Sequence, residues 1–213
     1  MLTAGIILLD VNQVEGWLVK GYQPTITAKS VQQAQKRSGD FNYRDTASNS
    51  LSGIINARRH AKDIAVIGAV AIPQDNVYLP IGKGVSKTVL ALAAGTMKVN
   101  QTMGKGNYAL AGHNMDDSKT LFSPIYAKAK PGQKVYISDF SQVYVYQITD
   151  RQEIPATDLS ILNDTSSPTI TLITCNWTGS KRIAVKGKLV KTYEYKAAPQ
   201  KVRNLFAHQY NQE

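Results

Sequence analysis

Cysteine is almost absent from this chain, because Cys175 is the only one among 213 residues. A single cysteine excludes a disulfide within the chain and a structural zinc site built on several thiols. By default a solitary cysteine is a small buried hydrophobe. Whether Cys175 has a chemical role therefore depends on the residues around it.

Acidic residues are also few. Lys and Arg number 25 against 15 Asp and Glu, which gives a formal net charge of +10. This balance favours an anionic partner, such as nucleic acid, an anionic membrane or an acidic polymer. No zinc-ligand spacing, arginine-rich arm or aromatic RNA-binding signature is present, so we expect no nucleic-acid partner.

Long apolar runs are missing as well. The run Leu2–Leu9 is ended by Asp10 after eight residues, whereas a membrane-spanning helix needs about 20. The run is either a short buried or disordered end or the remnant of a membrane anchor. We divide the chain into a possible anchor remnant (1–16), a polar extension or linker (17–63) and one domain with a C-terminal helix (64–213).

The pattern from residue 65 onward is that of strands. Apolar alternation broken by turn residues predicts seven or eight short strands with few helices, which is typical of an antiparallel barrel or sandwich. Helices are expected at Leu51–Arg59, at Ser86–Ala93 and after Pro199. Val31–Lys36 is polar nearly all round, so a helix there would be solvated. The predicted strands are Ala65–Pro73, Val77–Ile81, Tyr108–His113, Gln133–Ser138, Val143–Ile154, Thr169–Cys175 and Arg182–Val190.

Side-chain alternation places three reactive residues on one side of the strands. If Ile170 and Leu172 face the core, Cys175 faces away from it. The same parity puts Arg182 and His113 outside, because their strands have apolar residues at the alternate positions. Cys175 and Arg182 are joined by a loop short enough to bring the strand ends together. Small residues such as Ala109 and Ala111 precede His113 on its face and form a floor for an extended peptide.

These residue types fit cysteine nucleophile chemistry. An adjacent imidazolium and guanidinium would favour the thiolate of Cys175 over the thiol. His113 could protonate a leaving amine as general acid, and Arg182 could stabilise an oxyanion. A phosphatase loop is excluded, because the sixth residue after the cysteine is Lys181 and a strand follows. A papain-like protease is excluded by the order of cysteine and histidine.

Three segments resemble the signatures of the class A sortases of Gram-positive bacteria. They are Leu110-Ala111-Gly112-His113-Asn114, Thr171-Leu172-Ile173-Thr174-Cys175 and Arg182-Ile183-Ala184-Val185-Lys186-Gly187, and the resemblance extends from about residue 64 to the C-terminus. It implies an all-β-dominated fold, a closed eight-stranded barrel with a few short helices and peripheral N- and C-terminal helices. It also implies a cysteine transpeptidase that cleaves a Leu-Pro-x-Thr-Gly (LPXTG) sorting signal between Thr and Gly. The acyl part is held as a thioester, which an amine of the cell-wall precursor lipid II resolves.

The resemblance also implies roles and partners. Cys175 would be the nucleophile, His113 the general acid/base and Arg182 the oxyanion and substrate stabiliser, while Ala111, Ile173 and Thr174 would line the signal groove. The partners would be LPXTG-bearing surface proteins, a lipid II or peptidoglycan amine, and an anionic membrane or wall surface. The enzyme would lie on the extracellular face of the cytoplasmic membrane, held by an N-terminal anchor that is incomplete here.

No cofactor is expected. Some members of the family bind calcium through acidic residues before the histidine strand, but Gly95–Tyr108 contains no Asp or Glu, so oxygen ligands are lacking. Two other functions stay open at this point: a cysteine endopeptidase that hydrolyses the same signal, and a non-catalytic barrel that binds wall polymers.

Overall fold

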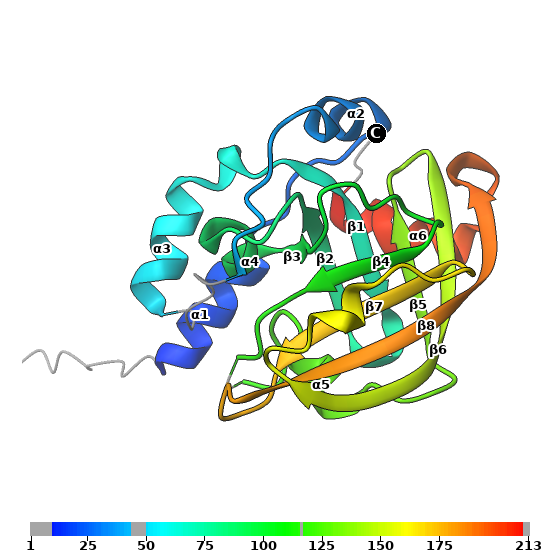
Figure 1. Ribbon diagram of the computed structural model, residues 1–213. Coiled ribbons are helices and arrows are strands. Elements are labelled where there is room, and N and C mark those ends of the chain that lie inside the picture. Colours follow the sequence, from blue (N-terminus) through cyan, green and yellow to red (C-terminus); the bar gives the residue numbers. More distant parts are fainter. Residues whose placement is uncertain (1–9, 44–49, 116, 211–213) are drawn as a thin grey trace, which may run out of the picture.

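The computed structural model describes residues 10–43, 50–115 and 117–210, apart from the side chains of residues 208 and 209 (Figure 1). Its centre is a closed barrel of eight strands in the order β1-β2-β3-β4-β7-β8-β6-β5. This confirms the expected barrel. The strands are β1 Val66–Ile72, β2 Val77–Gly82, β3 Ala94–Thr96, β4 Asn107–Ala111, β5 Lys134–Ser138, β6 Gln142–Pro155, β7 Thr169–Cys175 and β8 Lys181–Glu194.

The barrel departs from a purely antiparallel one at two places. β2 pairs with β3 in parallel, and so does β4 with β7. The first parallel pair is joined by helix α4 (Lys87–Leu92), a crossover of the kind that parallel neighbours require. β3 was not predicted, because three residues are too few to show an alternation.

The barrel interior is filled by the side chains that strand parity assigned to the core. Ile170, Leu172 and Tyr108 belong to the main buried cluster, together with Ile183 and Val185 of β8. Ala109, Ile173 and Ala184 belong to a separate apolar cluster on the other face of the same strands. The two faces of β4, β7 and β8 therefore separate the core from the site.

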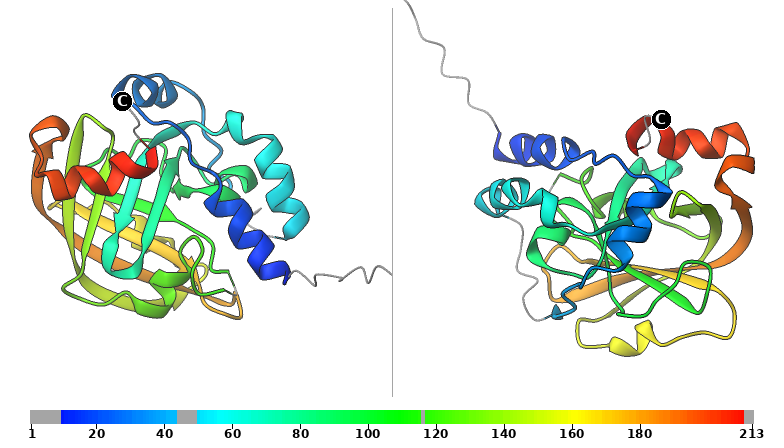
Figure 2. Two further views of the ribbon diagram at one scale, coloured as in Figure 1. Left: turned by 180° about the vertical axis from the view of Figure 1, so that it is seen from behind. Right: turned by 90° about the horizontal axis from the view of Figure 1, so that it is seen from above.

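Helices surround the barrel on the outside (Figures 1 and 2). α4 begins after Ser86, whose hydroxyl accepts a hydrogen bond from the Val89 amide, as an N-cap does. The helix expected at Leu51–Arg59 is α3, with those same bounds. The helices are α1 Val11–Lys20, α2 Ala28–Gln35, α3 Leu51–Arg59, α4, α5 Ser123–Lys128 and α6 Gln200–Tyr210, with short 3-10 turns η2 Ala61–Asp63, η3 Pro73–Asp75, η4 Leu159–Leu162 and η5 Tyr195–Ala197.

Two of these helices differ from the expectation for a polar extension. The prediction that a helix at Val31–Lys36 would be solvated is wrong, because Val31 and Ala34 of α2 are buried and the helix packs against β1. In α3, which packs against α4 and α1, Ile54 is fully buried. Two or three apolar residues on one face were enough to dock each helix, which the overall polarity concealed.

The C-terminal helix packs on the barrel as predicted. α6 lies across β1 and β2 and buries Val202 and Phe206 there (Figure 2). Its last residue, Tyr210, accepts a backbone hydrogen bond from the amide of Ile26 at 2.7 Å. Among the described residues, no helix has the length and apolarity needed to cross a bilayer. The run Leu2–Leu9, for which a possible anchor remnant is one of the two interpretations given above, lies outside the described residues.

Candidate active site

Cys175 and Arg182 are opposite each other on neighbouring strands. β7 ends at Cys175 and β8 pairs with it antiparallel, with Cys175 directly opposite Arg182. Directly opposite residues have Cβ atoms about 5 Å apart and side chains on the same face. The loop that joins them returns on itself through a hydrogen bond from the Asn176 amide to the Lys181 carbonyl, at 3.1 Å. Sequence parity had therefore predicted this pair correctly.

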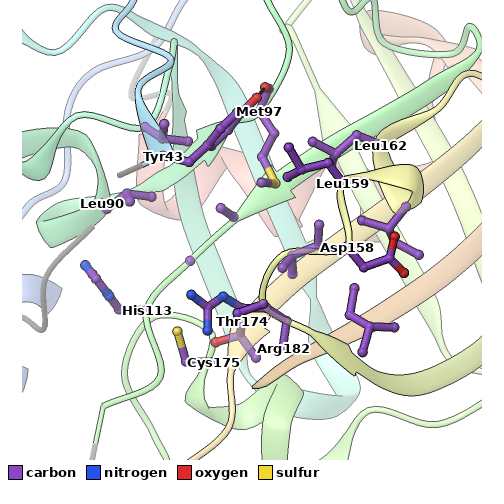
Figure 3. A pocket seen from close by; sticks show the side chains of 17 residues that line it. Tyr43, Leu90, Met97, His113, Asp158, Leu159, Leu162, Thr174, Cys175 and Arg182 are labelled. Carbon is purple, nitrogen blue, oxygen red and sulfur yellow. Dashed lines mark hydrogen bonds between the residues drawn. The ribbon is translucent and has the colours of Figure 1, made fainter. Parts of the chain in front are cut away.

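Arg182 is held in place by that same loop. Its Nη1 donates to the carbonyl of Gly179 at 2.9 Å and to that of Lys181 at 3.2 Å. Gly179 has φ +70, in the left-handed region that favours glycine. The turn thus directs a carbonyl at the guanidinium and fixes its position beside the thiol (Figure 3).

His113 follows β4, the strand on the other side of β7. The amide of Gly112 donates to the carbonyl of Ile173 at 3.0 Å, and the His113 carbonyl accepts from Phe122 at 3.0 Å. A Cβ on Gly112 would lie 2.5 Å from Cγ of Phe122, so this position requires glycine for the ring to pack there. Asn114 adds a side-chain hydrogen bond to the Cys175 carbonyl at 3.1 Å. These contacts fasten the histidine segment to the cysteine strand.

The three side chains converge at one end of a pocket. Figure 3 shows Cys175 between His113 on one side and Arg182 on the other. All three are half-buried, so each is accessible from the pocket while partly shielded from water. A nucleophile, a proton carrier and a fixed cation within one cleft are the parts that acyl transfer needs.

The charge state of His113 differs from the sequence-based expectation. Burial, and next to it the Arg182 guanidinium, lowers the pKa of His113 from 6.5 to about 4. At neutral pH the resting imidazole is therefore neutral. The cation beside Cys175 in the resting site is Arg182, and His113 is in the form that accepts a proton.

The predicted groove residues all line the pocket. Ala111 is opposite Ile173 in the β4–β7 register, and Thr174 follows on β7. The hydroxyl oxygen of Thr174 is buried, with no hydrogen-bond partner among the described residues.

Most of the apolar pocket lining was missed from sequence. The cavity of about 120 Å³ is walled by the 3-10 turn η4, by residues around α4 and β3, and by Tyr43 from the segment before the barrel. None of these lies on a strand adjacent to Cys175, so parity could not assign them. The lining residues not predicted are Tyr43, Val85, Leu90, Met97, Gly112, Ile154, Ala156, Asp158, Leu159, Ile161 and Leu162.

No group of three or more His, Cys, Asp or Glu side chains that could hold a metal ion occurs in the part of the chain that the structure describes. The expected absence of a cofactor stays a prediction.

The chain is similar in sequence to known proteins of one family. The family model described as the sortase domain matches residues 70–190. Sortase A of Streptococcus agalactiae is 37% identical over 194 residues, covering 88% of this chain and 78% of that protein. Sortase A of Listeria monocytogenes is 33% identical over 199 residues, covering 90% of this chain and 89% of that protein.

Solved structures agree. The crystal structure of Listeria monocytogenes sortase A matches with a TM-score of 0.61 and 39% identity, over 65% of this chain and 94% of that one. Sortase C-3 of Streptococcus pneumoniae matches with a TM-score of 0.63 at 20% identity, which shows the fold alone. With the barrel, the family match and relatives of this similarity over most of its length, the chain belongs to the sortase family as a class A sortase, a cysteine transpeptidase.

Proposed function

We propose that this transpeptidase cleaves an LPXTG-type sorting signal between Thr and Gly and transfers the acyl part to an amine of lipid II. The observation that carries the proposal is the convergence of Cys175, His113 and Arg182 at one end of an apolar, strand-floored pocket. An extended peptide fits such a floor because small side chains let its backbone approach the strands.

Acylation uses all three residues, and His113 acts twice. Neutral His113 takes the thiol proton as the Cys175 sulfur attacks the threonine carbonyl carbon, and the carbonyl electron pair becomes an oxyanion beside Arg182. When the oxyanion collapses, the bond to the glycine nitrogen breaks and the His113 imidazolium gives that nitrogen its proton. The result is a thioester on Cys175, a free glycine amine and a neutral imidazole.

Deacylation reverses the roles. The amine of the acceptor attacks the thioester carbonyl, His113 removes a proton from its nitrogen, and the thiolate leaves and regains a proton from His113. The new amide joins the surface protein to the wall precursor. Water as the acceptor would give hydrolysis, which is the endopeptidase alternative.

We further propose that calcium is not required. In support, the segment before the histidine strand has no acidic residue, and its Lys98 ammonium donates to the carboxylate of Asp164 at 2.5 Å. Asp164 also accepts from the Asn107 amide at 3.1 Å. A lysine thus ties the β3–β4 connection to the β6–β7 connection. The hydrogen bonds from Lys98 and from the Asn107 amide stabilise the Asp164 carboxylate and so lower the pKa of this carboxyl.

The cellular setting is proposed by analogy with the family. A net charge of +10 suits the anionic membrane and wall polymers of a Gram-positive surface. The enzyme would work on the extracellular face of the cytoplasmic membrane, held by an N-terminal anchor.

The experiment is incubation of an LPXTG peptide with and without an amine donor, followed by mass spectrometry of peptide and protein. We expect an acyl-enzyme on Cys175, ligated product with the donor, and neither with Cys175→Ala. Hydrolysis alone with every donor would refute transpeptidation to amines. Undiminished cleavage by Cys175→Ala would refute the assigned nucleophile.

A further inference from the structure

Residues before the barrel contribute to the substrate pocket. Tyr43 lines the same cavity as Cys175 and Arg182, although it lies well outside the residues 70–190 that match the sortase domain. It packs against an apolar cluster that includes Leu90 and Met97. The segment that sequence reading treated as a linker therefore reaches the site.

Several contacts fasten that segment to the barrel. The Lys83 ammonium donates to the carbonyls of Gln35 and Arg37, at 2.6 and 2.7 Å, where helix α2 ends. Further along, Asp40 forms a bridge with Gly84, and its carbonyl accepts from the Val85 amide at 2.6 Å. The path of the chain from α2 into the pocket is therefore set by backbone and ammonium hydrogen bonds.

The tyrosine ring is fixed at its far end as well. The phenol of Tyr43 donates to the carbonyl of Met97, at the end of β3. Burial raises the pKa of Tyr43, which keeps the phenol a neutral donor. The ring spans the gap between the segment and the barrel and adds an aromatic surface to the pocket.

The Tyr43 ring lies at the end of the pocket far from Cys175. Figure 3 shows Tyr43, Leu90 and Met97 at the end of the pocket opposite Cys175 and Arg182. In an extended peptide each residue advances about 3.3 Å, so the leucine of LPXTG lies about 10 Å from the scissile threonine carbonyl. In the proposed binding mode the leucine side chain would therefore enter the apolar end of the pocket, where Leu90 and Met97 lie.

We infer that Tyr43 is a specificity-determining residue of this sortase, forming one wall of the subsite for the leucine of the sorting signal. The inference rests on the proposed function for the identity of the peptide. Removal of the ring would leave the leucine partly exposed to water, and an apolar subsite loses about 10- to 200-fold discrimination at most from such changes.

The test compares kcat/KM for a Leu-Pro-x-Thr-Gly peptide and for its Ala-Pro-x-Thr-Gly analogue. With Tyr43→Ala we expect the preference for leucine to fall about tenfold, mainly through a higher KM, with kcat little changed. Tyr43→Phe keeps the ring and should retain most of the preference. The matched control is Tyr193→Ala. Tyr193 lies on β8 and does not line the pocket, so this variant should leave the preference for leucine unchanged.

Two outcomes would overturn the inference. An unchanged preference in Tyr43→Ala means that the ring does not contact the leucine. A higher kcat/KM with an unchanged preference means that the ring obstructs the pocket instead of forming its wall.

A second experiment distinguishes failure of the proposed function from failure of this inference. Calorimetry measures the binding of both peptides to the Cys175→Ala variant and to the Cys175→Ala, Tyr43→Ala double variant. If the wild-type chain cleaves neither peptide but binding still depends on leucine and on Tyr43, the wall assignment stands and the reaction is wrong. Loss of that dependence refutes the wall whatever the turnover.

Discussion

Protonation of His113 is expected to destabilise the folded chain. Burial and Arg182 lower the pKa of His113 to about 4 in the folded state, whereas an unfolded chain has a histidine pKa of about 6.5. Between these values the unfolded chain binds more protons, so the free energy of unfolding falls as the pH falls. The contribution is about 2 kcal/mol by pH 5 and about 3 kcal/mol below pH 4.

The assay is urea unfolding of the wild-type chain and of His113→Gln at pH 7.5 and pH 5. Other groups titrate equally in both proteins, so the difference between their unfolding free energies isolates His113. We expect the wild-type protein to lose about 2 kcal/mol more than the variant over this interval. A titration by NMR, with the His113 signals assigned by their loss in the variant, should give a midpoint well below 6.

Equal pH dependence in both proteins would refute the reasoning, and so would an NMR midpoint near 6.5. In either case His113 would be solvated in the resting enzyme, and the neutral imidazole assigned to the first proton transfer would be one population among two.

Four further outcomes are expected. Arg182→Gln should raise the pKa of His113 in the same NMR titration, because a cation is removed, and lower kcat/KM at least a hundredfold. Gly112→Ala should cost about 1–3 kcal/mol of unfolding free energy and reduce turnover, because its Cβ would lie 2.5 Å from the Phe122 ring; urea melts and peptide kinetics measure both. Lys98→Met should raise KM, because the β6–β7 connection loses the hydrogen bond from Lys98 to Asp164. Added calcium should leave the rate of the wild-type enzyme unchanged, and saturable activation by calcium would contradict this prediction.

Strand parity predicted correctly that Cys175 and Arg182 face the same side. Ile170 and Leu172 are strongly apolar and have one sensible side, so the alternation fixed the direction of Cys175 without knowledge of the fold. The same reasoning placed Arg182, because the loop between them is short. The pairing of β7 with β8 is local in the sequence, and a local pairing can be predicted from it. The pairing of β7 with β4 joins segments that are far apart in the sequence.

The apolar end of the pocket could not be read in the same way. Leu159 and Leu162 lie on a 3-10 turn after β6, and Tyr43 precedes the barrel by more than 20 residues. Their approach to Met97 depends on how the connections pack over the barrel mouth, which no periodicity encodes. Docking of α2 was missed for a related reason, because two buried residues on one face, Val31 and Ala34, are enough to dock an otherwise polar helix.

The reactive side chains and the apolar pocket lining come from different parts of the fold. Cys175 and Arg182 lie opposite each other on β7 and β8, and His113 follows β4, so their mutual geometry depends on these strands and on the loops at their ends. Residues that line the far end of the pocket come from connections and from the segment around Tyr43. Because connections tolerate sequence change better than barrel strands, selectivity for the leucine end can vary without disturbing the chemistry. A preference that moves with Tyr43 while kcat is preserved is the kinetic signature of that separation.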